Sequence, residues 1–391
     1  MHILIIPSWY PSNANDISGC FFREQAIALK ESGCRVGVIS VSFSSLLNWR
    51  NVLSPSLGQT YENDTGVETF RKQITNWFPR MPLAQSWLYK RKGMILFQNY
   101  IKKFGKPDII HVHSMLYGGC VALNIYKKYN IPFVVTEHST AFARGLVKPN
   151  AIKMAYGIAN SAKKLFAVSH PFASLLDEKI NSDNQWGVLH NIVQKTFFEE
   201  PIKQSKNNPF VFISIAGLAK KKNMHIALGA FAKAFKGDRN VFLRIGGEGV
   251  ERSSLENLAV KLEINKQVKF LGLLKRKQVV EQMMLSDAFV LASRYETFGV
   301  VVVEALALGK PVIATRCGGP EDIVRERDGY LVPINDVDEM AKAMSKMVEK
   351  RDDFKSEEIR ASCKARFDEK VISQSLIKSY ERVLKNIEKN K

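Results

Sequence analysis

The chain has 391 residues, more than one hydrophobic core usually serves, so two domains of similar size are expected. Hydrophobic residues make up 46% and charged residues 24%, a composition that excludes a disordered chain. The formal net charge of +19 indicates an anionic partner, and charge alone leaves open a nucleotide phosphate, nucleic acid, a phospholipid surface and an acidic glycan. Five cysteines without C-x-x-C spacing argue against a disulfide framework and a zinc site and favour a reducing cytosol.

Short apolar runs alternate with amphipathic stretches, a pattern typical of parallel α/β structure. In the first half it predicts strands at residues 2–6, 35–41, 109–113, 133–136, 164–168 and 187–190. The first of these has no basic region before it and is followed by Pro7, so we expect a buried strand and not a signal peptide. In the second half strands are predicted at 210–216, 241–245, 268–271, 288–291 and 311–314.

The two halves are separated by a polar, Pro-bounded segment at 199–209, which we interpret as a linker. This divides the chain into an N-terminal domain, 1–198, and a C-terminal domain, 210–366. Apolar residues at helical spacing predict a closing helix in 367–391, which we expect to pack back toward the first domain. No uncharged apolar run approaches the roughly 20 residues of a spanning helix, so any membrane contact is expected to be peripheral.

The segment 286–324 carries the richest chemistry. It predicts a strand, a loop, a helix beginning near Phe298, another strand and a Gly-Gly loop. Gly299 lets the backbone approach a ligand at a helix start, where N–H groups and the helix dipole attract a phosphate. Glu296 and Glu304 bracket this point, and carboxylates accept charge-assisted hydrogen bonds from sugar diols. A solvated loop charge remains open for Glu296, whereas the apolar VVVVEALAL around Glu304 disfavours a solvated helix position.

This segment resembles the signature of family-4 retaining glycosyltransferases, in which two Glu are separated by seven residues, and the match continues through GKPVIATRCGGPEDIV and DGYLVP. The resemblance implies that Glu296 contacts the donor sugar and Glu304 the nucleotide ribose. It also implies sugar contacts from the backbone amides of three residues, namely Phe298, Gly299 and Val300.

AGLAKKKN, at 216–223, resembles the family element whose Arg and Lys pair with the donor diphosphate. Lys222 occupies the Lys position. Gly217 stands at the Arg position, a departure that Lys220, Lys221 or Arg294 could offset, and we assign Gly217 and Arg294 to the donor site. Gly247 lies in LRIGGEGV, which resembles the family's G-x-G turn and fits ligand contact or a tight structural turn equally well.

In the first half, VVTEHSTAF places His138 just beyond a strand, and the resemblance implies that it reaches the transferred sugar. We therefore predict His138, Lys222 and Glu296 as catalytic. SGCFF resembles the glycine-bearing first loop of the family, so Gly19 is assigned to the acceptor side together with His113 and Arg144. HVH at 111–113 invites a metal interpretation, but no third ligand is nearby and a packed strand end is favoured.

A basic, aromatic stretch at 71–106 has nine Lys or Arg and no Asp or Glu, and interleaved with them are Trp77, Phe78, Trp87, Tyr89, Phe97 and Tyr100. Our hypothesis is that it docks on the cytoplasmic leaflet of an anionic membrane, with the aromatic residues at the interface. The alternative is that the aromatic residues are core and the charges solvate a surface. We expect no nucleic-acid partner because no recognition module is visible.

The resemblance implies two facing Rossmann-like α/β domains of GT-B architecture with an interdomain cleft. It implies a retaining enzyme that transfers a hexose from a UDP- or GDP-sugar to a glycan or lipid-linked saccharide in bacterial surface polysaccharide, lipopolysaccharide or glycolipid synthesis. No D-x-D motif stands in a plausible place, so transfer without a metal or cofactor is expected. A nucleotide-sugar epimerase, or a non-catalytic protein that binds glycan or nucleic acid, remains the alternative.

Overall fold

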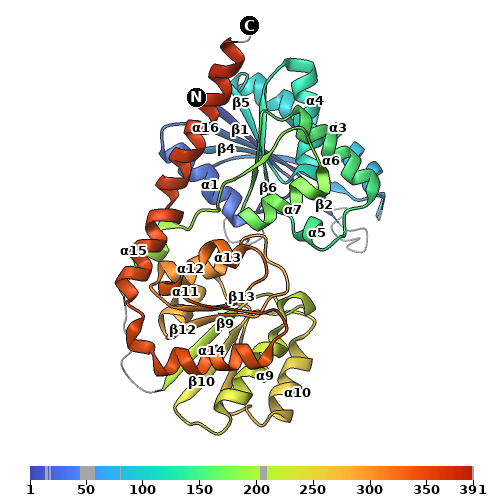
Figure 1. Ribbon diagram of the computed structural model, residues 1–391. Coiled ribbons are helices and arrows are strands. Elements are labelled where there is room, and N and C mark those ends of the chain that lie inside the picture. Colours follow the sequence, from blue (N-terminus) through green and yellow to red (C-terminus); the bar gives the residue numbers. More distant parts are fainter. Residues whose placement is uncertain (14–15, 17–18, 45–57, 80, 203–208, 390–391) are drawn as a thin grey trace. The chain divides into compact units, whose positions relative to one another are not determined.

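The computed structural model describes residues 1–13, 16, 19–44, 58–79, 81–202 and 209–389, which form two compact units (Figure 1). Unit 1 consists of Met1–Ile192 and Glu369–Lys391, and unit 2 consists of Val193–Asp368. The division falls before the expected linker at 199–209, because Phe197 and Phe198 are buried within unit 2 and Val193 forms a bridge with Asp368. Residues 203–208 of that expected linker lie outside the described residues.

Unit 1 is built on an eight-stranded sheet in the order β3-β4-β2-β1-β5-β6-β7-β8. All neighbouring strands are parallel except β3 and β4. Its strands are β1 His2–Pro7, β2 Arg35–Ser44, β3 Gln59–Asp64, β4 Val67–Thr75, β5 Ile109–His113, β6 Phe133–Glu137, β7 Lys164–Ala167 and β8 Trp186–Val188. Its helices are α1 Cys20–Glu31, α3 Pro82–Phe104, α4 Cys120–Tyr129, α5 Thr140–Ala143, α6 Pro149–Ser161, α7 His170–Ile180 and α16 Glu369–Lys389, with a π-helical turn η2 at Met115–Gly119.

The hairpin of β3 and β4 is absent from the sequence prediction. β3, QTYEND, is polar and mostly exposed because it is the edge strand of the sheet, so it has no apolar run to reveal it. β4 consists of buried and partly buried residues without strict alternation, and it pairs with β2 from Glu68 to Thr75. Arg71 and Lys72, predicted as part of a docking segment, therefore lie in a sheet strand, and Arg71 forms an ion pair with Glu62.

The closing helix α16 belongs to unit 1 and packs against α1. Ile372, Leu376 and Tyr380 lie in the same apolar cluster as β1 and β2. The hydroxyl of Tyr380 lies 2.6 Å from Nδ1 of His111 on β5. The last helix therefore completes the core of the first sheet although it follows unit 2 in the chain.

Unit 2 contains a fully parallel six-stranded sheet in the order β11-β10-β9-β12-β13-β14. The strands are β9 Phe210–Ile215, β10 Val241–Gly246, β11 Val268–Gly272, β12 Ala288–Leu291, β13 Val312–Thr315 and β14 Gly329–Val332, the last of which was not predicted. The helices are α8 Lys195–Glu199, α9 Met224–Phe235, α10 Arg252–Lys261, α11 Arg276–Met284, α12 Val300–Ala307, α13 Gly319–Ile323, α14 Val337–Glu349 and α15 Ser356–Phe367. Short 3-10 turns lie at η3 Lys220–Lys222, η4 Glu326–Asp328 and η5 Arg351–Asp353.

Helices flank both faces of each sheet (Figure 1), and the prediction of two Rossmann-like α/β domains is confirmed. The strand order reverses between β1 and β5 in unit 1 and between β9 and β12 in unit 2. In open parallel sheets, ligands bind beyond the carboxyl ends of the strands at such a switch point. Within the part of the chain that the structure describes, every helix is too short or too polar to cross a bilayer.

Candidate functional site

The loop after β9 carries the cation predicted to bind a diphosphate. β9 ends at Ile215, and the chain makes the η3 turn before α9 begins. Asn223 joins the turn to the helix in the left-handed region, at φ 51°, and is buried. Asn tolerates this conformation better than most residues do. The turn therefore fixes Lys222 at the carboxyl end of β9.

Lys222 and Glu296 form an ion pair across the switch point of unit 2. Nζ of Lys222 lies 2.5 Å from Oε1 of Glu296, and the hydroxyl of Ser293 donates to the same oxygen at 2.7 Å. The two charged side chains are only 18% and 12% exposed, so water screens this pair less than a surface pair. The cation predicted for the diphosphate and the carboxylate predicted for the sugar therefore hold each other in place.

The Gly-Gly loop after β13 fixes the backbone of Glu296. The N–H of Glu296 donates to the carbonyl of Cys317 at 3.0 Å, and its carbonyl accepts from the N–H of Gly319 at 2.8 Å. A Cβ on Gly319 would lie 2.0 Å from the carbonyl oxygen of Phe298. Only a residue without a side chain allows this approach, so the CGG sequence is needed to position the loop of Glu296.

Helix α12 begins directly after Gly299, which has φ 104°. The N–H groups of the first turn of a helix have no carbonyl partner inside the helix and carry the positive end of its dipole. The first turn of α12 contains no acidic residue that would compete for this position. The start of α12, with the predicted amides of Phe298, Gly299 and Val300, is therefore suited to an anion.

Glu304 lies inside α12 and is 2% exposed. Its Oε1 accepts a hydrogen bond from Nη1 of Arg276, the first residue of α11. The guanidinium of Arg276 lies 4.6 Å from the ring centroid of Phe197, and its Nε reaches Oε1 of Gln194 at 3.3 Å. The solvated interpretation of Glu304 is thus wrong, and Arg276 is a partner that the sequence prediction missed.

Gly247 and Gly217 differ in what the backbone requires of them. Gly247 has φ 131°, and a Cβ there would lie 1.9 Å from the carbonyl oxygen of Ala216. Any other residue would push β10 away from the loop after β9, so Gly247 has a structural role. Gly217 is exposed, and the nearest atom to a Cβ there is the carbonyl oxygen of Glu248 at 4.0 Å. The structure therefore has room for a Cβ at position 217, so lack of space does not explain why a basic residue is missing there.

Arg294 is attached to the turn that carries Lys222. Its N–H donates to the carbonyl of Lys221 at 2.9 Å, and its Nε donates to Oδ1 of Asn223 at 2.8 Å. Asn223 is held in turn by a 2.7 Å bond from its Nδ2 to Oδ1 of Asn335. Arg294 is exposed, so its charge is directed into solvent from a fixed point. Arg294, which we predicted as a substitute for the cation absent at Gly217, is thus anchored to the turn of Lys222.

In unit 1, His113 at the end of β5 and His138 just after β6 form a buried pair. Nδ1 of His113 lies 3.0 Å from Nε2 of His138. Burial lowers the pKa of both imidazoles well below the usual value, so both are neutral at physiological pH. The ring of Phe22 packs against both, at centroid distances of 4.7 and 4.8 Å. A neutral, oriented imidazole is suited to hydrogen bonding and is a weak base.

Glu137 holds the loop that carries His138. Its carboxylate accepts hydrogen bonds from the N–H groups of Met115, His138 and Ser139 at 2.8–2.9 Å. The residue is fully buried, and burial raises the pKa of the carboxyl against the opposing effect of these bonds. The sequence prediction did not single out Glu137, although an acidic residue at the end of an apolar strand was the available signal.

The remaining predicted residues of unit 1 lie in different places. Gly19 has φ 75° and precedes α1, the helix that brings Phe22 to the histidine pair. Ser18 lies outside the described residues. Arg144 follows α5 and is exposed. Gly19 therefore lies at the start of the helix that contacts the histidine pair through Phe22, and Arg144 lies six residues after His138.

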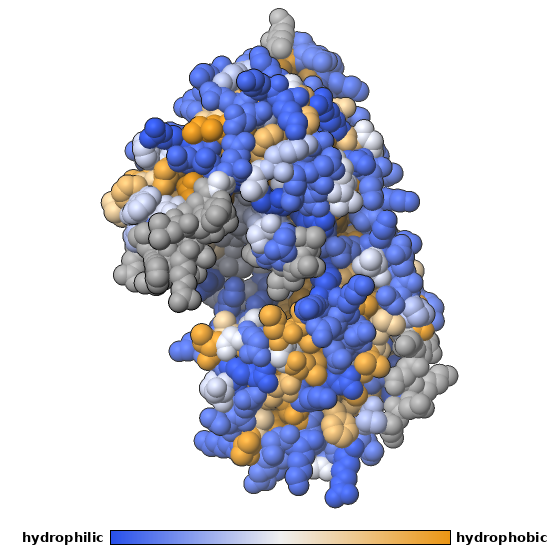
Figure 2. Space-filling view, turned by 180° about the vertical axis from the view of Figure 1, so that it is seen from behind, coloured by the Kyte–Doolittle hydropathy of each residue, from blue (hydrophilic) through white to orange (hydrophobic). Residues whose placement is uncertain are grey.

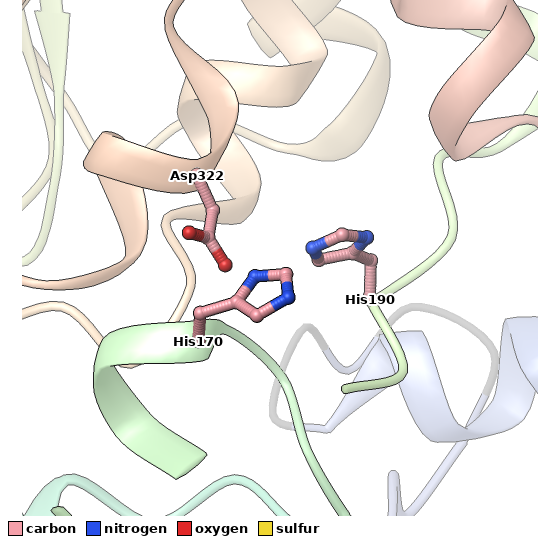
Figure 3. Close-up of side chains that lie close together, drawn as sticks. All are labelled: His170, His190 and Asp322. Carbon is pink, nitrogen blue, oxygen red and sulfur yellow. The ribbon is translucent and has the colours of Figure 1, made fainter. Parts of the chain in front are cut away.

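His111 and His113 lie on one face of β5, as the alternation of a strand predicts, with ring centroids 4.2 Å apart. Nε2 of His111 lies 2.8 Å from the hydroxyl of Thr136, and its Nδ1 contacts Tyr380, so His111 is a packed core residue. Figure 3 shows two further histidines of unit 1, His170 and His190, whose ring centroids lie 6.4 Å apart; Asp322, also labelled, belongs to unit 2. Two imidazoles are fewer than the three protein ligands of a catalytic zinc, so that pair alone defines no metal site.

Comparison with known families identifies the class. Residues 21–196 match the family model described as Glycosyltransferase Family 4, and residues 196–366 match the model described as Glycosyl transferases group 1. The two matches together cover every strand of both sheets except β1, and they leave out Gly19. The chain therefore belongs to the family-4 glycosyltransferases and has the α/β domains of their GT-B fold.

Individual relatives agree with this assignment. The chain is 28% identical over 267 residues to the alpha-monoglucosyldiacylglycerol synthase of Acholeplasma laidlawii, covering 60% of this chain and 67% of that protein. It is 24% identical over 367 residues to the putative teichuronic acid biosynthesis glycosyltransferase TuaC of Bacillus subtilis, covering 88% and 89%. The crystal structure of Anabaena HepE in complex with UDP-glucose has a TM-score of 0.72 at 18% identity, covering 98% and 100%, a likeness of fold.

Proposed function

We propose that the protein is a retaining hexosyltransferase that takes a UDP- or GDP-sugar as donor in unit 2. The observation that carries this proposal is the ion pair of Lys222 with Glu296 beside the start of α12, at the switch point of a parallel sheet. A diphosphate and a sugar ring need a cation, helix amides and a carboxylate within a few ångströms of one another. This loop cluster supplies all three from residues whose backbones are fixed.

Departure of the nucleoside diphosphate is the step that needs electrostatic stabilisation. Lys222 and the amides at the start of α12 would bind the negative charge that grows on the phosphate, and Arg294 would add a second cation. Removal of one preorganised group of this kind typically lowers the rate by about 10²–10³. Glu296 would hold hydroxyls of the hexose, and Glu304, held by Arg276, would hold the ribose diol.

Retention would follow from attack of the acceptor on the face from which the diphosphate leaves. The acceptor oxygen forms a bond to the anomeric carbon as the bond from that carbon to the phosphate oxygen breaks, and the acceptor proton passes to the leaving phosphate. His138 would hydrogen-bond the transferred sugar and not serve as the base, because burial lowers the pKa of its imidazole well below the usual value. The cations and amides would make a metal unnecessary.

The names of two relatives support a proposal for the class of acceptor. An alpha-monoglucosyldiacylglycerol synthase and a putative teichuronic acid biosynthesis glycosyltransferase are among the matched proteins. We propose a glycan or lipid-linked saccharide acceptor in bacterial surface polysaccharide or glycolipid synthesis, with the protein on the cytoplasmic face of the membrane. His113, Gly19 and Arg144 of unit 1 would belong to the acceptor side.

A thermal-shift series with UDP, GDP and their hexose conjugates tests the proposal, because a ligand present at 100 times its Kd stabilises the folded state by about 2.7 kcal/mol. The stabilising donor is then incubated with and without acceptor, in the presence of chelator, and the anomeric configuration of the product is read by NMR. We expect α-linked product from an α-linked donor in chelator. An altered nucleotide sugar formed without acceptor would indicate an epimerase, and no stabilising nucleotide would refute the donor site.

A further inference from the structure

Helix α3 has a buried face and an exposed apolar face. Tyr89, Phe97 and Tyr100 are at most 1% exposed and belong to the core, which corrects the expectation that they lie at a membrane interface. On the opposite face, a residue is exposed at every fourth position, giving the stripe Leu83, Trp87, Arg91 and Ile95. Trp87 is 52% exposed and Leu83 54% exposed, which is unusual for such large apolar side chains.

The exposed stripe extends beyond the helix. Trp77, Phe78 and Met81, which precede α3, are exposed, and so is Leu146 in the loop before α6. The two segments meet at an open hollow of about 450 Å³ whose lining includes Met81, Leu83, Lys148 and Pro149. We define the docking surface as the following residues: Trp77, Phe78, Met81, Leu83, Trp87, Arg91, Leu146 and Lys148. In Figure 2, orange hydrophobic side chains interrupt the blue surface of unit 1.

The segments that form the docking surface are free of acidic residues. Residues 69–107 contain nine Lys or Arg and no Asp or Glu, and residues 138–176 contain five Lys or Arg and no Asp or Glu. Some of these cations are engaged elsewhere, since Arg71 pairs with Glu62 and Lys103 lies 3.4 Å from the ring centroid of Tyr61. Arg80 lies outside the described residues.

Two of the cations belong to the docking surface itself. Arg91 lies over the ring of Trp87 at 5.7 Å, which keeps the charge beside the stripe. Lys148 lines the hollow that joins the two segments. A second copy of the chain is disfavoured as occupant because it would present the same excess of positive charge. An anionic bilayer suits both the cations and the exposed apolar side chains of the docking surface. Its lipid phosphates would bind the cations, and its interfacial zone would take up the Trp and Leu side chains.

We propose that the docking surface of unit 1 binds the anionic lipid headgroups of a bilayer, with Trp77, Trp87 and Leu146 inserted at the interface. The inference rests on the proposed function in one respect, namely that a lipid-linked acceptor would be met at this surface. A basic residue near an anionic membrane contributes about 1 kcal/mol, so each one lost is expected to weaken binding roughly fivefold.

Flotation of the full-length protein with phosphatidylcholine vesicles, with and without phosphatidylglycerol, tests the proposal. We expect flotation only with phosphatidylglycerol, and less of it at high salt. The variant R91E/K148E should reduce the bound fraction at least 10-fold, and W87A/L146A should reduce it while leaving the salt dependence in place. The matched controls lie on exposed positions of unit 2, K266E/K269E for charge and V260A for apolar area, and should float as the unchanged protein does.

The results separate this inference from the proposed function. Loss of flotation in the docking-surface variants, with an unchanged thermal shift by the nucleotide sugar, supports the inference. Flotation that is equal with neutral vesicles, or equally reduced by the unit 2 controls, overturns it. A concentration-dependent dimer without vesicles that W87A/L146A abolishes would assign the surface to a second copy and also overturn it. A missing thermal shift with intact flotation would instead refute the donor site alone.

Discussion

Replacement of Lys222 by Met is the most informative single change in the donor site. Met keeps most of the volume of the Lys stem and removes the charge that pairs with Glu296 at 2.5 Å. A hydrogen bond to a charged group contributes about 1.5–3 kcal/mol, so loss of the Lys222 contact should weaken binding of UDP or GDP about 10- to 100-fold. Because the charge on the diphosphate grows in the transition state, kcat should fall by about 10²–10³.

Glu296→Gln is the matched partner of this variant. It removes the carboxylate that competes with a diphosphate for Lys222, so the affinity for the nucleoside diphosphate alone should stay equal or rise, while transfer of the hexose should fall. Isothermal titration with UDP and GDP, next to steady-state kinetics, measures both quantities. If Lys222→Met leaves the affinity for both diphosphates unchanged, Lys222 serves only to hold Glu296, and the assignment of the diphosphate to this loop fails.

Three further outcomes follow from buried contacts. Arg276→Met should destabilise the protein by about 2 kcal/mol in chemical denaturation. This is less than the roughly 3–5 kcal/mol lost when a fully buried ion pair is broken, because the side chain of Arg276 is 31% exposed. An unchanged denaturation midpoint would argue against the pairing of Arg276 with Glu304. Tyr380→Phe leaves Nδ1 of buried His111 without its partner and should cost about 1–3 kcal/mol, whereas an equally stable variant would show that α16 does not support β5. Burial lowers the pKa of His111 to about 3, so between pH 6.5 and 3 the unfolded state binds a proton at this histidine that the folded state does not. Stability should therefore fall by about 1.4 kcal/mol per pH unit over that window, and His113, whose pKa burial also lowers, should add to the fall. A denaturation midpoint that is constant between pH 7 and 5 would contradict this.

The buried parallel strands could be predicted from sequence because each is a short apolar run bounded by polar turns. β5 and β12 have the predicted bounds, and the others differ at their ends by a few residues. The strands that were missed lie at or beside a sheet edge. β3 is the polar edge strand of unit 1, and β14 is the edge of the second sheet, with only four residues. β3 lacks the apolar run that reveals a strand, whereas β14, GYLV, is apolar but very short; the other two edge strands, β8 and β11, were predicted.

Most of the residues assigned to the donor site lie between 294 and 304 and follow a family pattern, so the sequence alone was enough to propose them. Their partners could not be proposed in this way, because those partners are chosen by packing. Glu304 required a cation, but the chain has 57 Lys and Arg, and only the position of α11 beside α12 selects Arg276. The same holds for Asn223, which orients Arg294 from a buried position in another loop.

The aromatic residues of α3 show how a correct composition can lead to an incorrect placement. Considered as a basic, aromatic stretch, Trp87 and Tyr89 are equivalent, and both were expected at a membrane interface. In a helix, residues that are two positions apart in the sequence, such as 87 and 89, are separated by about 200° around the axis. One of them therefore faces the core when the other faces solvent. Tyr89 donates from its buried hydroxyl to the carbonyl of Pro7 at 2.7 Å, and Trp87 stands exposed under Arg91. The helical period, applied before the composition, separates the core residues from the docking residues.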